Sequence, residues 1–457
     1  MMKTTILTAA SLLLSLTVSA RTDGGITAGM LEEFRNNVTL DATGKAVRNA
    51  LNAADINVLA VNAENAAMID TEFSDKVESK GITDQKRSGR CWLFTGLNVL
   101  RADVISKYSL KEFTFSQSYC FFWDQLEKSN LFLQAVIDTR DRAMDDREVD
   151  WLFSHPIGDG GTFTGVANLV MKYGLVPSSA MPESRIAEST SQMSRHLATI
   201  LRQDGLELRR NPENVKKSEL EAFLQKRKTG MLSEIYRFLT LCLGVPPTEF
   251  EWEGKKYTPR GFYDEILGYD LNNNYVMLMN DPLREYGKVY EIKYDRHLYD
   301  GQNWLYLNLP VERIKEMAIA SIRADRAMYF SCDVRKFYLR DKGVLDLKNY
   351  DYESLLGIKF PMTKAERVLV HDSGSSHAMT LMAVDVKDGK PVKWMVENSW
   401  GPKAGWKGHL IMTDEWFDEY MFRLVVERRF VPADLQKALD QKPVQLPVWD
   451  PMYLQDE

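Results

Sequence analysis

The apolar positions that follow Ser88-Gly89 have the spacing of a helix. Five of them recur at steps of three and four residues, the period of one buried helix face: Leu93, Leu97, Leu100, Val104 and Tyr108. Cys91 lies in the first turn of this predicted helix. Unpaired backbone N–H groups and the positive end of the helix dipole stabilise an anion there, so the position favours a thiolate. The pattern makes Cys91 a candidate nucleophile, although buried cysteines also occur at helix starts without a catalytic role.

A second pattern alternates with period two near residue 390. The run "HAMTLMAV" begins at His377, and "VKWMVEN" ends at Asn398 with apolar residues on alternate positions. Asp388-Gly389 between them is a tight-turn signal, so the pattern predicts a β-hairpin. A two-residue turn places Asn398 opposite Met379, one diagonal step from His377, and a four-residue loop places it directly opposite His377. In either register the two side chains can touch.

A thiolate nucleophile needs a base and a group that orients the base. His377 and Asn398 fit these roles, because an amide oxygen that accepts the imidazole N–H sets the tautomer and the ring direction. Trp400, two residues further on, can shield that bond from water. Gln85 precedes Cys91 by six residues, and its amide can converge with the Cys91 backbone N–H on a developing oxyanion. The alternative is a His and an Asn that merely share a sheet face.

The first twenty residues, "MMKTTILTAASLLLSLTVSA", contain one lysine, a continuous apolar run and a Val18-Ser19-Ala20 ending. These features predict a secretory signal peptide, with a mature chain that starts at Arg21 and is exported to the periplasm or outside the cell. A buried first helix is the alternative. No later stretch reaches the roughly 18 apolar residues of a membrane span, so we expect none.

The length, net charge and cysteine spacing of the chain limit the kinds of partner and cofactor that we expect. The chain has 457 residues, 44% of them hydrophobic, enough for two or three structural units. Its 64 acidic and 58 basic residues give a net charge of −6, and the basic residues are scattered, so we expect no nucleic-acid partner. The four cysteines have neither metal-ligand nor disulfide-framework spacing. We expect no metal or cofactor, and we interpret Cys120, Cys242 and Cys332 as small buried hydrophobic residues.

Several stretches resemble the papain-like cysteine peptidases, specifically the branch of bleomycin hydrolase and bacterial aminopeptidase C. They are "TDQKRSGRCWLF", "SHAMT", "VENSWG", "FSQSYCFFWDQLEKSN", "MLSEIYRFLTLCLG", "MTKAER" and the terminal "LPVWDPM". The resemblance implies that Cys91 is the nucleophile, His377 the base, Asn398 its orienting group and Gln85 the oxyanion donor. Two departures stand out: Asp84 where the family commonly has Asn, and "GGTF" at 160–163 where Gly-Gly-Gln-Trp is common.

The same resemblance implies a cysteine aminopeptidase that releases N-terminal residues through a thioester, assembled as a homo-hexamer around an internal channel. Its substrates are peptides with a free N-terminus. The C-terminal arm is expected to enter the cleft, where we assign Asp456 and Glu457 as substrate-binding carboxylates. The alternatives are a papain-type endopeptidase with an open cleft and a catalytically inactive assembly protein. The second would usually lack Cys91, His377 or Asn398.

The resemblance implies an α+β fold of papain type. Cys91 and His377 are separated by about twice the 130–150 residues of ordinary papain-like enzymes, which requires an insertion. We therefore divide the chain into a signal peptide (1–20), an N-terminal helical arm (21–75), a helical left half with the nucleophile helix (76–185), a helical insertion (186–290), a β-rich right half with His377 and Asn398 (291–430) and a C-terminal arm (431–457).

Overall fold

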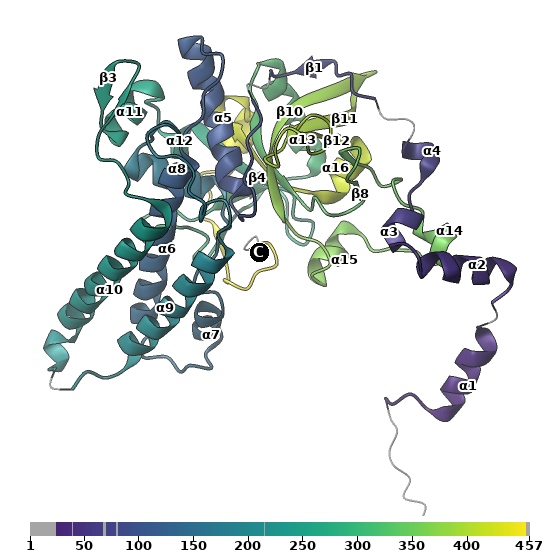
Figure 1. The fold of residues 1–457 in the computed structure, drawn as a ribbon, viewed down its shortest axis with the longest axis horizontal. Helices are drawn as coiled ribbons and strands as arrows, with labels where there is room; N and C mark the ends of the chain where they lie inside the picture. The colour runs from purple at the N-terminus through teal and green to yellow at the C-terminus, as the bar shows by residue number, and fades with distance from the viewer. Residues whose placement is uncertain (1–23, 39, 67–69, 79–80, 214, 454–457) are drawn as a thin grey trace, which may run out of the picture. The chain divides into compact units, whose positions relative to one another are not determined.

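The computed structural model describes residues 24–38, 40–66, 70–78, 81–213 and 215–453 (Figure 1). The predicted signal peptide and the carboxylates of Asp456 and Glu457 lie outside these ranges. The chain forms two compact units that divide between Ala60 and Val61. The first contains three helices with no buried residue among those described: α1 (Ala28–Asn37), α2 (Ala42–Leu51) and α3 (Ile56–Leu59).

The second unit has a helical half and a half built on a sheet (Figure 1). The helices of the first half are α5 (Cys91–Tyr108), α6 (Gln117–Asp138), α7 (Arg147–Ser154), α8 (Phe163–Tyr173), α9 (Ser191–Arg209), α10 (Leu220–Leu243), α11 (Pro259–Ile266) and α12 (Leu271–Asn274). The other helices of this unit are α4 (Ala63–Ala66), α13 (Val311–Arg323), α14 (Tyr352–Leu356), α15 (Lys364–Leu369), α16 (Asp414–Tyr420) and α17 (Ala433–Ala438).

The sheet is mixed, and its strands follow the order β14-β5-β6-β4-β13-β7-β10-β11-β12-β9-β8, with β1 paired to β10. These strands are β1 (Asp75–Lys76), β4 (Tyr275–Met279), β5 (Val289–Ile292), β6 (Leu305–Asn308), β7 (Met328–Cys332), β8 (Tyr338–Leu339), β9 (Val344–Leu345), β10 (His377–Lys387), β11 (Lys390–Glu397), β12 (His409–Thr413), β13 (Met421–Glu427) and β14 (Val444–Leu446). The predicted α+β class is confirmed.

The nucleophile helix α5 is buried on nearly every side. It packs against α6 and α8 and also against strand β10, so it joins the two halves (Figure 1). This burial explains why apolar and small residues occupy almost all of its positions between Cys91 and Leu100. The helix begins at Cys91, which therefore lies in its first turn as predicted, and it ends at Tyr108. Its C-cap, Ser109, adopts a left-handed conformation with φ 52°.

Strands β10 and β11 form the predicted hairpin. Lys387 pairs with Lys390, and the two residues between them have φ 51° (Asp388) and 77° (Gly389), the left-handed pair that a type I′ turn requires. Thr380 pairs with Glu397 at the far end. Of the two registers considered, the one with a two-residue turn is therefore correct, because it places Asn398 opposite Met379.

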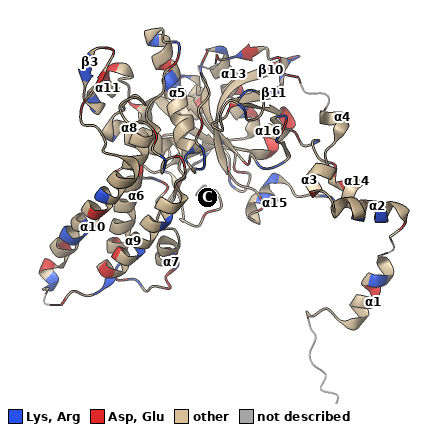
Figure 2. Cartoon of the chain, in the orientation of Figure 1, with Lys and Arg blue, Asp and Glu red and all other residues tan. Residues whose placement is uncertain are grey.

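The segment 186–290 contains more than helices. The long helices α9 and α10 pack on α6, and charged residues of both signs lie along them (Figure 2). A small hairpin follows, formed by β2 (Phe250–Trp252) and β3 (Lys255–Tyr257), and β4 then enters the main sheet beside β13. All five residues of β4 are buried, and periodicity alone does not distinguish such an apolar run from a buried helix.

No helix in the described part of the chain is both long and apolar enough to cross a membrane.

Candidate active site

A cleft of about 700 Å³ brings together residues from both halves of the second unit. Gln85 and Cys91 line it from the helical side, and His377 and Trp400 line it from the sheet side. The two candidate partners of a thiol reaction, a cysteine and a histidine, therefore line one cleft although they lie far apart in the sequence.

Cys91 is the first residue of α5, with Arg90 as the N-cap. The first turn contains no acidic residue, so nothing in it opposes the positive end of the helix dipole. Cys91 is 2% exposed yet lines the cleft. A sulfur in this position is protected from bulk water on all sides except the one that faces a bound substrate.

His377 is the first residue of β10, and its Nε2 lies 2.8 Å from Asn398 Oδ1. The backbone N–H of Ser399 donates to the same oxygen at 2.8 Å, which identifies that atom as the amide oxygen. His377 Nε2 must then be the protonated nitrogen that donates, which leaves Nδ1 without its proton in the neutral ring. The contact expected between these two side chains is present, and it defines the tautomer of the imidazole.

The surroundings of His377 favour its neutral form. Burial lowers the pKa of His377 to about 4, and the hydrogen bond to Asn398 opposes this shift. The Trp400 ring stacks on the imidazole with centroids 4.6 Å apart, as its position two residues after Asn398 suggests. At neutral pH the ring is therefore a base that can accept a proton, and a neighbouring thiolate would stabilise the resulting imidazolium.

Gln85 is held at both ends of its amide. Its Nε2 donates to the carbonyl oxygen of Ser88 at 2.7 Å, and its Oε1 accepts from the Ser399 hydroxyl at 2.6 Å. Its backbone N–H also donates to Ser399 O at 2.8 Å. One amide hydrogen is used by Ser88, and the second hydrogen is available to a group in the cleft. Ser399 thus ties the Gln85 loop to the segment that carries Asn398.

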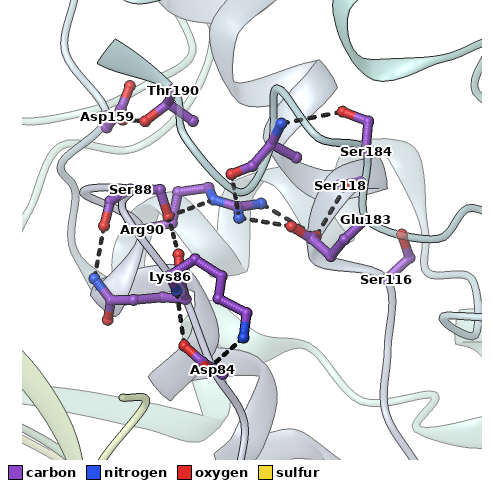
Figure 3. A network of polar contacts seen from close by, with 12 residues as sticks. Asp84, Lys86, Ser88, Arg90, Ser116, Ser118, Asp159, Glu183, Ser184 and Thr190 are labelled. Atoms are coloured by element: carbon purple, nitrogen blue, oxygen red, sulfur yellow. Dashed lines mark hydrogen bonds and ion pairs between the residues drawn. The ribbon is translucent and has the colours of Figure 1, made fainter. Parts of the chain in front are cut away.

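The loop that enters α5 is fixed by a buried arginine (Figure 3). Arg90 is fully buried and pairs with Glu183 at 2.6 Å. Its guanidinium also donates to the Ser88 hydroxyl at 2.9 Å and to Ala187 O at 2.7 Å. Because these contacts use several N–H groups of one planar guanidinium, they hold the backbone immediately before Cys91 in a single position.

A buried charge cluster behind Trp92 is a feature that the sequence did not predict. His297 Nδ1 lies 2.5 Å from Asp124 Oδ1, and Lys128 lies 3.0 Å from the other oxygen of Asp124. Burial opposes the charge on Asp124, but Lys128 and His297 outweigh it and hold the pKa of Asp124 below its ordinary value. The His297 ring also meets the Trp92 ring edge-on at 4.7 Å. The Asp124–Lys128 spacing is a recognisable helical pair, but nothing in the sequence links it to His297.

The same cluster supports one wall of the cleft. Lys128 donates to the carbonyl oxygens of Gly158 and Gly160 at 3.0 and 2.5 Å, and Trp92 Nε1 donates to Asp159 O at 2.7 Å. A Cβ on Gly161 would collide with the His297 ring. The segment "GGTF" at 160–163, where the chain departs from the common family pattern, follows this wall directly. The close approach of His297 explains why glycine is needed at 161.

The end of the described chain approaches this wall. Met452 is buried, and its carbonyl oxygen accepts from Arg423 at 2.6 Å. Tyr453 donates to Tyr294 O at 3.2 Å and lines a small cavity of about 70 Å³. His155, Pro156, Ile157 and Gly158 line both this cavity and the cleft. The C-terminal segment is therefore anchored beside the cleft at its last described residue.

Within the described ranges, no group of three or more His, Cys, Asp or Glu side chains is arranged to hold a metal ion.

Comparison with known proteins matches residues 25–453 to the Peptidase C1-like family. Aminopeptidase C of Lactobacillus delbrueckii subsp. lactis is 36% identical, over 92% of this chain and 96% of the relative. Bleomycin hydrolase of Gallus gallus is 40% identical, over 82% of this chain and 86% of the relative. The crystal structure of PepW from Lactobacillus rhamnosis superposes with a TM-score of 0.88 at 34% identity, and covers 94% of this chain and 99% of that one.

The predicted export is wrong. The aminopeptidase C relatives from Lactobacillus and Lactococcus are intracellular enzymes, and the segment 1–20 on which the prediction rested lies outside the described residues. A short apolar run behind one lysine is also typical of an ordinary apolar helix, so composition alone did not distinguish the two interpretations.

The fold, the cleft and these matches agree. The family match spans nearly the whole chain, and the relatives are matched over most of their own length. The resemblance inferred from the short motifs is confirmed. The chain belongs to the Peptidase C1-like family and is a cysteine aminopeptidase related to aminopeptidase C and bleomycin hydrolase.

Proposed function

We propose that this aminopeptidase hydrolyses peptides with Cys91 as nucleophile, His377 as general base and acid, Asn398 as orienting group and Gln85 as oxyanion donor. One observation carries the proposal: the 2.8 Å contact of His377 Nε2 with Asn398 Oδ1, beside a cleft that Cys91 and Gln85 also line. With Nε2 held by Asn398, Nδ1 is the nitrogen left for the thiol proton.

The reaction has two halves. His377 Nδ1 takes the proton of the Cys91 thiol, and the thiolate attacks the scissile carbonyl. The free N–H of Gln85 and the backbone N–H of Cys91 stabilise the oxyanion, and the imidazolium protonates the departing amine as the C–N bond breaks. A water molecule, deprotonated by His377, then hydrolyses the thioester and regenerates the thiol.

The restriction to N-terminal residues is assigned to the C-terminal arm. In this proposal Asp456, Glu457 and the terminal carboxylate bind the α-ammonium of the peptide and block the cleft beyond it. The anchoring of Met452 and Tyr453 beside the cleft wall supports this assignment, because it fixes the point from which the arm continues.

We also propose a homo-hexamer. Large apolar side chains exposed near the end of α10 support an assembly surface, with Leu241 74% and Val245 69% exposed. Light scattering should give a mass of about six chains of 52.5 kDa. A monomer at working concentrations would contradict this part of the proposal.

Selective alkylation tests the nucleophile. Burial raises the pKa of Cys120 to about 12 and also raises that of Cys242, so neither should react quickly at pH 7. One equivalent of iodoacetamide should modify Cys91 and abolish turnover, as read by peptide mapping and residual activity. Cys242→Ser is the matched control and should be inactivated at the wild-type rate. Full activity after complete modification of Cys91 would refute the assignment.

A further inference from the structure

The cleft is strongly basic although the chain is acidic. Among the described residues, five cationic side chains line it, namely Lys86, Arg87, Arg202, Arg335 and Arg340, against one carboxylate, that of Asp159. The carboxylates assigned to the C-terminal arm in the proposed function belong to the other end of the cleft, where the α-ammonium binds. Over the whole sequence, acidic residues outnumber basic ones, 64 to 58. A cleft lined by one sign of charge concentrates and orients substrates of the opposite sign.

The carboxylate of Asp159 already accepts hydrogen bonds from neighbouring residues. Asp159 accepts hydrogen bonds from the hydroxyl of Thr190 (Figure 3), from the hydroxyl of Ser194 at 2.7 Å and from the backbone N–H of Gly89 at 3.3 Å. These contacts tie its oxygens to the helical wall. Asp159 is therefore not placed to neutralise the arginines of the opposite wall.

Arg335 and Arg340 belong to the same half of the second unit as the base. Both lie on the segment after β7, whose last residue, Cys332, pairs with His377. Tyr338, between them, has its ring 6.1 Å from that of Trp400. Both arginines are exposed, and within the described part of the chain neither has an acidic partner within 4.0 Å, whereas Lys86 is paired with Asp84.

The proton transfer from His377 places the leaving group beside Arg335 and Arg340. His377 must deliver its proton to the departing amine nitrogen, so the part of the peptide after the scissile bond lies on the side of His377 rather than on that of the C-terminal arm. A carboxylate one or two residues beyond the scissile bond would then face Arg335 and Arg340.

We propose that Arg335 and Arg340 select substrates with a carboxylate just after the scissile bond. This inference rests on the proposed function of Cys91 and His377. The carboxylate can come from Asp or Glu at the second or third position of the peptide, or from the free C-terminus of a di- or tripeptide. Planar guanidinium groups suit this ligand, because each can bind a carboxylate with two parallel hydrogen bonds.

The test compares matched peptides by the release of alanine. Ala-Glu-Ala-amide is measured against Ala-Gln-Ala-amide for the side-chain carboxylate, and Ala-Ala against Ala-Ala-amide for the terminal one. For the wild type at low salt we expect kcat/KM to favour the carboxylate member of at least one pair by about 3- to 10-fold, the effect of one or two exposed ion pairs. The preference should shrink as about 0.5 M salt screens the charges.

Substitutions of Arg335 and Arg340 show whether these two residues cause the preference for a carboxylate. Arg335→Gln/Arg340→Gln should bring the ratio close to one, and Arg335→Glu/Arg340→Glu should invert it. Arg237→Gln, an exposed arginine on α10 that does not line the cleft, is the matched control and should keep the wild-type ratio. If the double variants do not fold, the salt dependence of the wild-type ratio decides.

Two kinds of failure are distinguishable. An equal rate for both members of each pair, or a preference that persists in Arg335→Gln/Arg340→Gln, would overturn this inference while cleavage of the neutral peptide still depends on Cys91. Cleavage of the neutral peptide by Cys91→Ala would instead overturn the proposed function.

Discussion

The imidazole of His377 is fixed by two neighbours with different roles. Asn398 sets which nitrogen carries the proton, and Trp400 stacks on the ring at 4.6 Å. Asn398 is only 1% exposed, so water cannot compete for its oxygen. Positioning of the base therefore depends on a hydrogen bond that is sheltered by an aromatic ring.

Replacement of these residues should affect turnover unequally. His377→Ala removes the base and should lower kcat by about 10²- to 10⁴-fold. Asn398→Ala leaves the base present but less well oriented, and should cost about tenfold, the value of one net hydrogen bond. Steady-state kinetics on one aminoacyl amide gives both numbers. The opposite order would mean that the roles are assigned wrongly.

The lowered pKa of His377 has a consequence for stability. Its folded pKa of about 4 lies below the ordinary value of 6.5, so the unfolded chain binds more protons between these values. The stabilisation is fully present above pH 6.5 and is lost as pH falls through about 4. The pH dependence of stability should be measured in a Cys91→Ala background, because this substitution removes any thiolate charge next to the ring.

Urea unfolding can measure this loss. Between pH 7 and pH 4.5, Cys91→Ala should lose about 2–3 kcal/mol more free energy of unfolding than Cys91→Ala/His377→Gln, in which this titration is absent. Parallel pH profiles for the two proteins would show that burial does not hold the ring neutral.

At the scale of elements, a buried ion pair joins the nucleophile helix to the strand that leads to Asn398. Arg101 of α5 lies 2.8 Å from Glu397 of β11, and both side chains are 5% exposed. Asn98 of α5 also donates to Glu397 at 3.1 Å. The pair links the two halves of the site across the interface between the helical half and the sheet half.

Removal of one partner should be costly. Arg101→Met removes the cation that lies 2.8 Å from the buried Glu397 carboxylate, and should lower the free energy of unfolding by about 3–5 kcal/mol. Arg101→Met/Glu397→Met removes both charges and should recover most of this loss. Chemical denaturation of both variants measures the difference. A double variant as unstable as the single one would show that packing, rather than the broken ion pair, explains the loss.

An element could be predicted from the sequence when its pattern lies within a few neighbouring residues. Helix α5 and the β10–β11 hairpin were predictable because helical spacing and an Asp-Gly turn are local features. These two elements carry Cys91 and His377, and Asn398 directly follows β11. Strand β4 was not predictable, because a short strand that is buried on both faces shows no alternation of apolar and polar residues. The His297–Asp124 contact joins residues 173 positions apart, and no local pattern reports such a contact.

At the scale of the whole molecule, the C-terminal arm should decide between exopeptidase and endopeptidase action. Deletion of residues 454–457 keeps the anchor at Tyr453 but removes the proposed carboxylates. It should raise cleavage of N-blocked peptides and lower that of free-amine peptides. Asp456→Asn/Glu457→Gln keeps the length, and should lower free-amine cleavage without raising blocked cleavage as much. An unchanged ratio in the deletion variant would show that the arm does not limit the substrate.

The proposed mechanism and its restriction to free N-termini are tested most directly by comparing alanyl-aminomethylcoumarin with its N-acetyl derivative on the wild type and on Cys91→Ala. We expect the wild type to cleave the free-amine substrate at least about tenfold faster, the contribution of one charge-assisted contact with the ammonium. We expect Cys91→Ala to cleave neither substrate. Equal cleavage of both substrates by the wild type, or turnover retained by Cys91→Ala, would contradict this proposal.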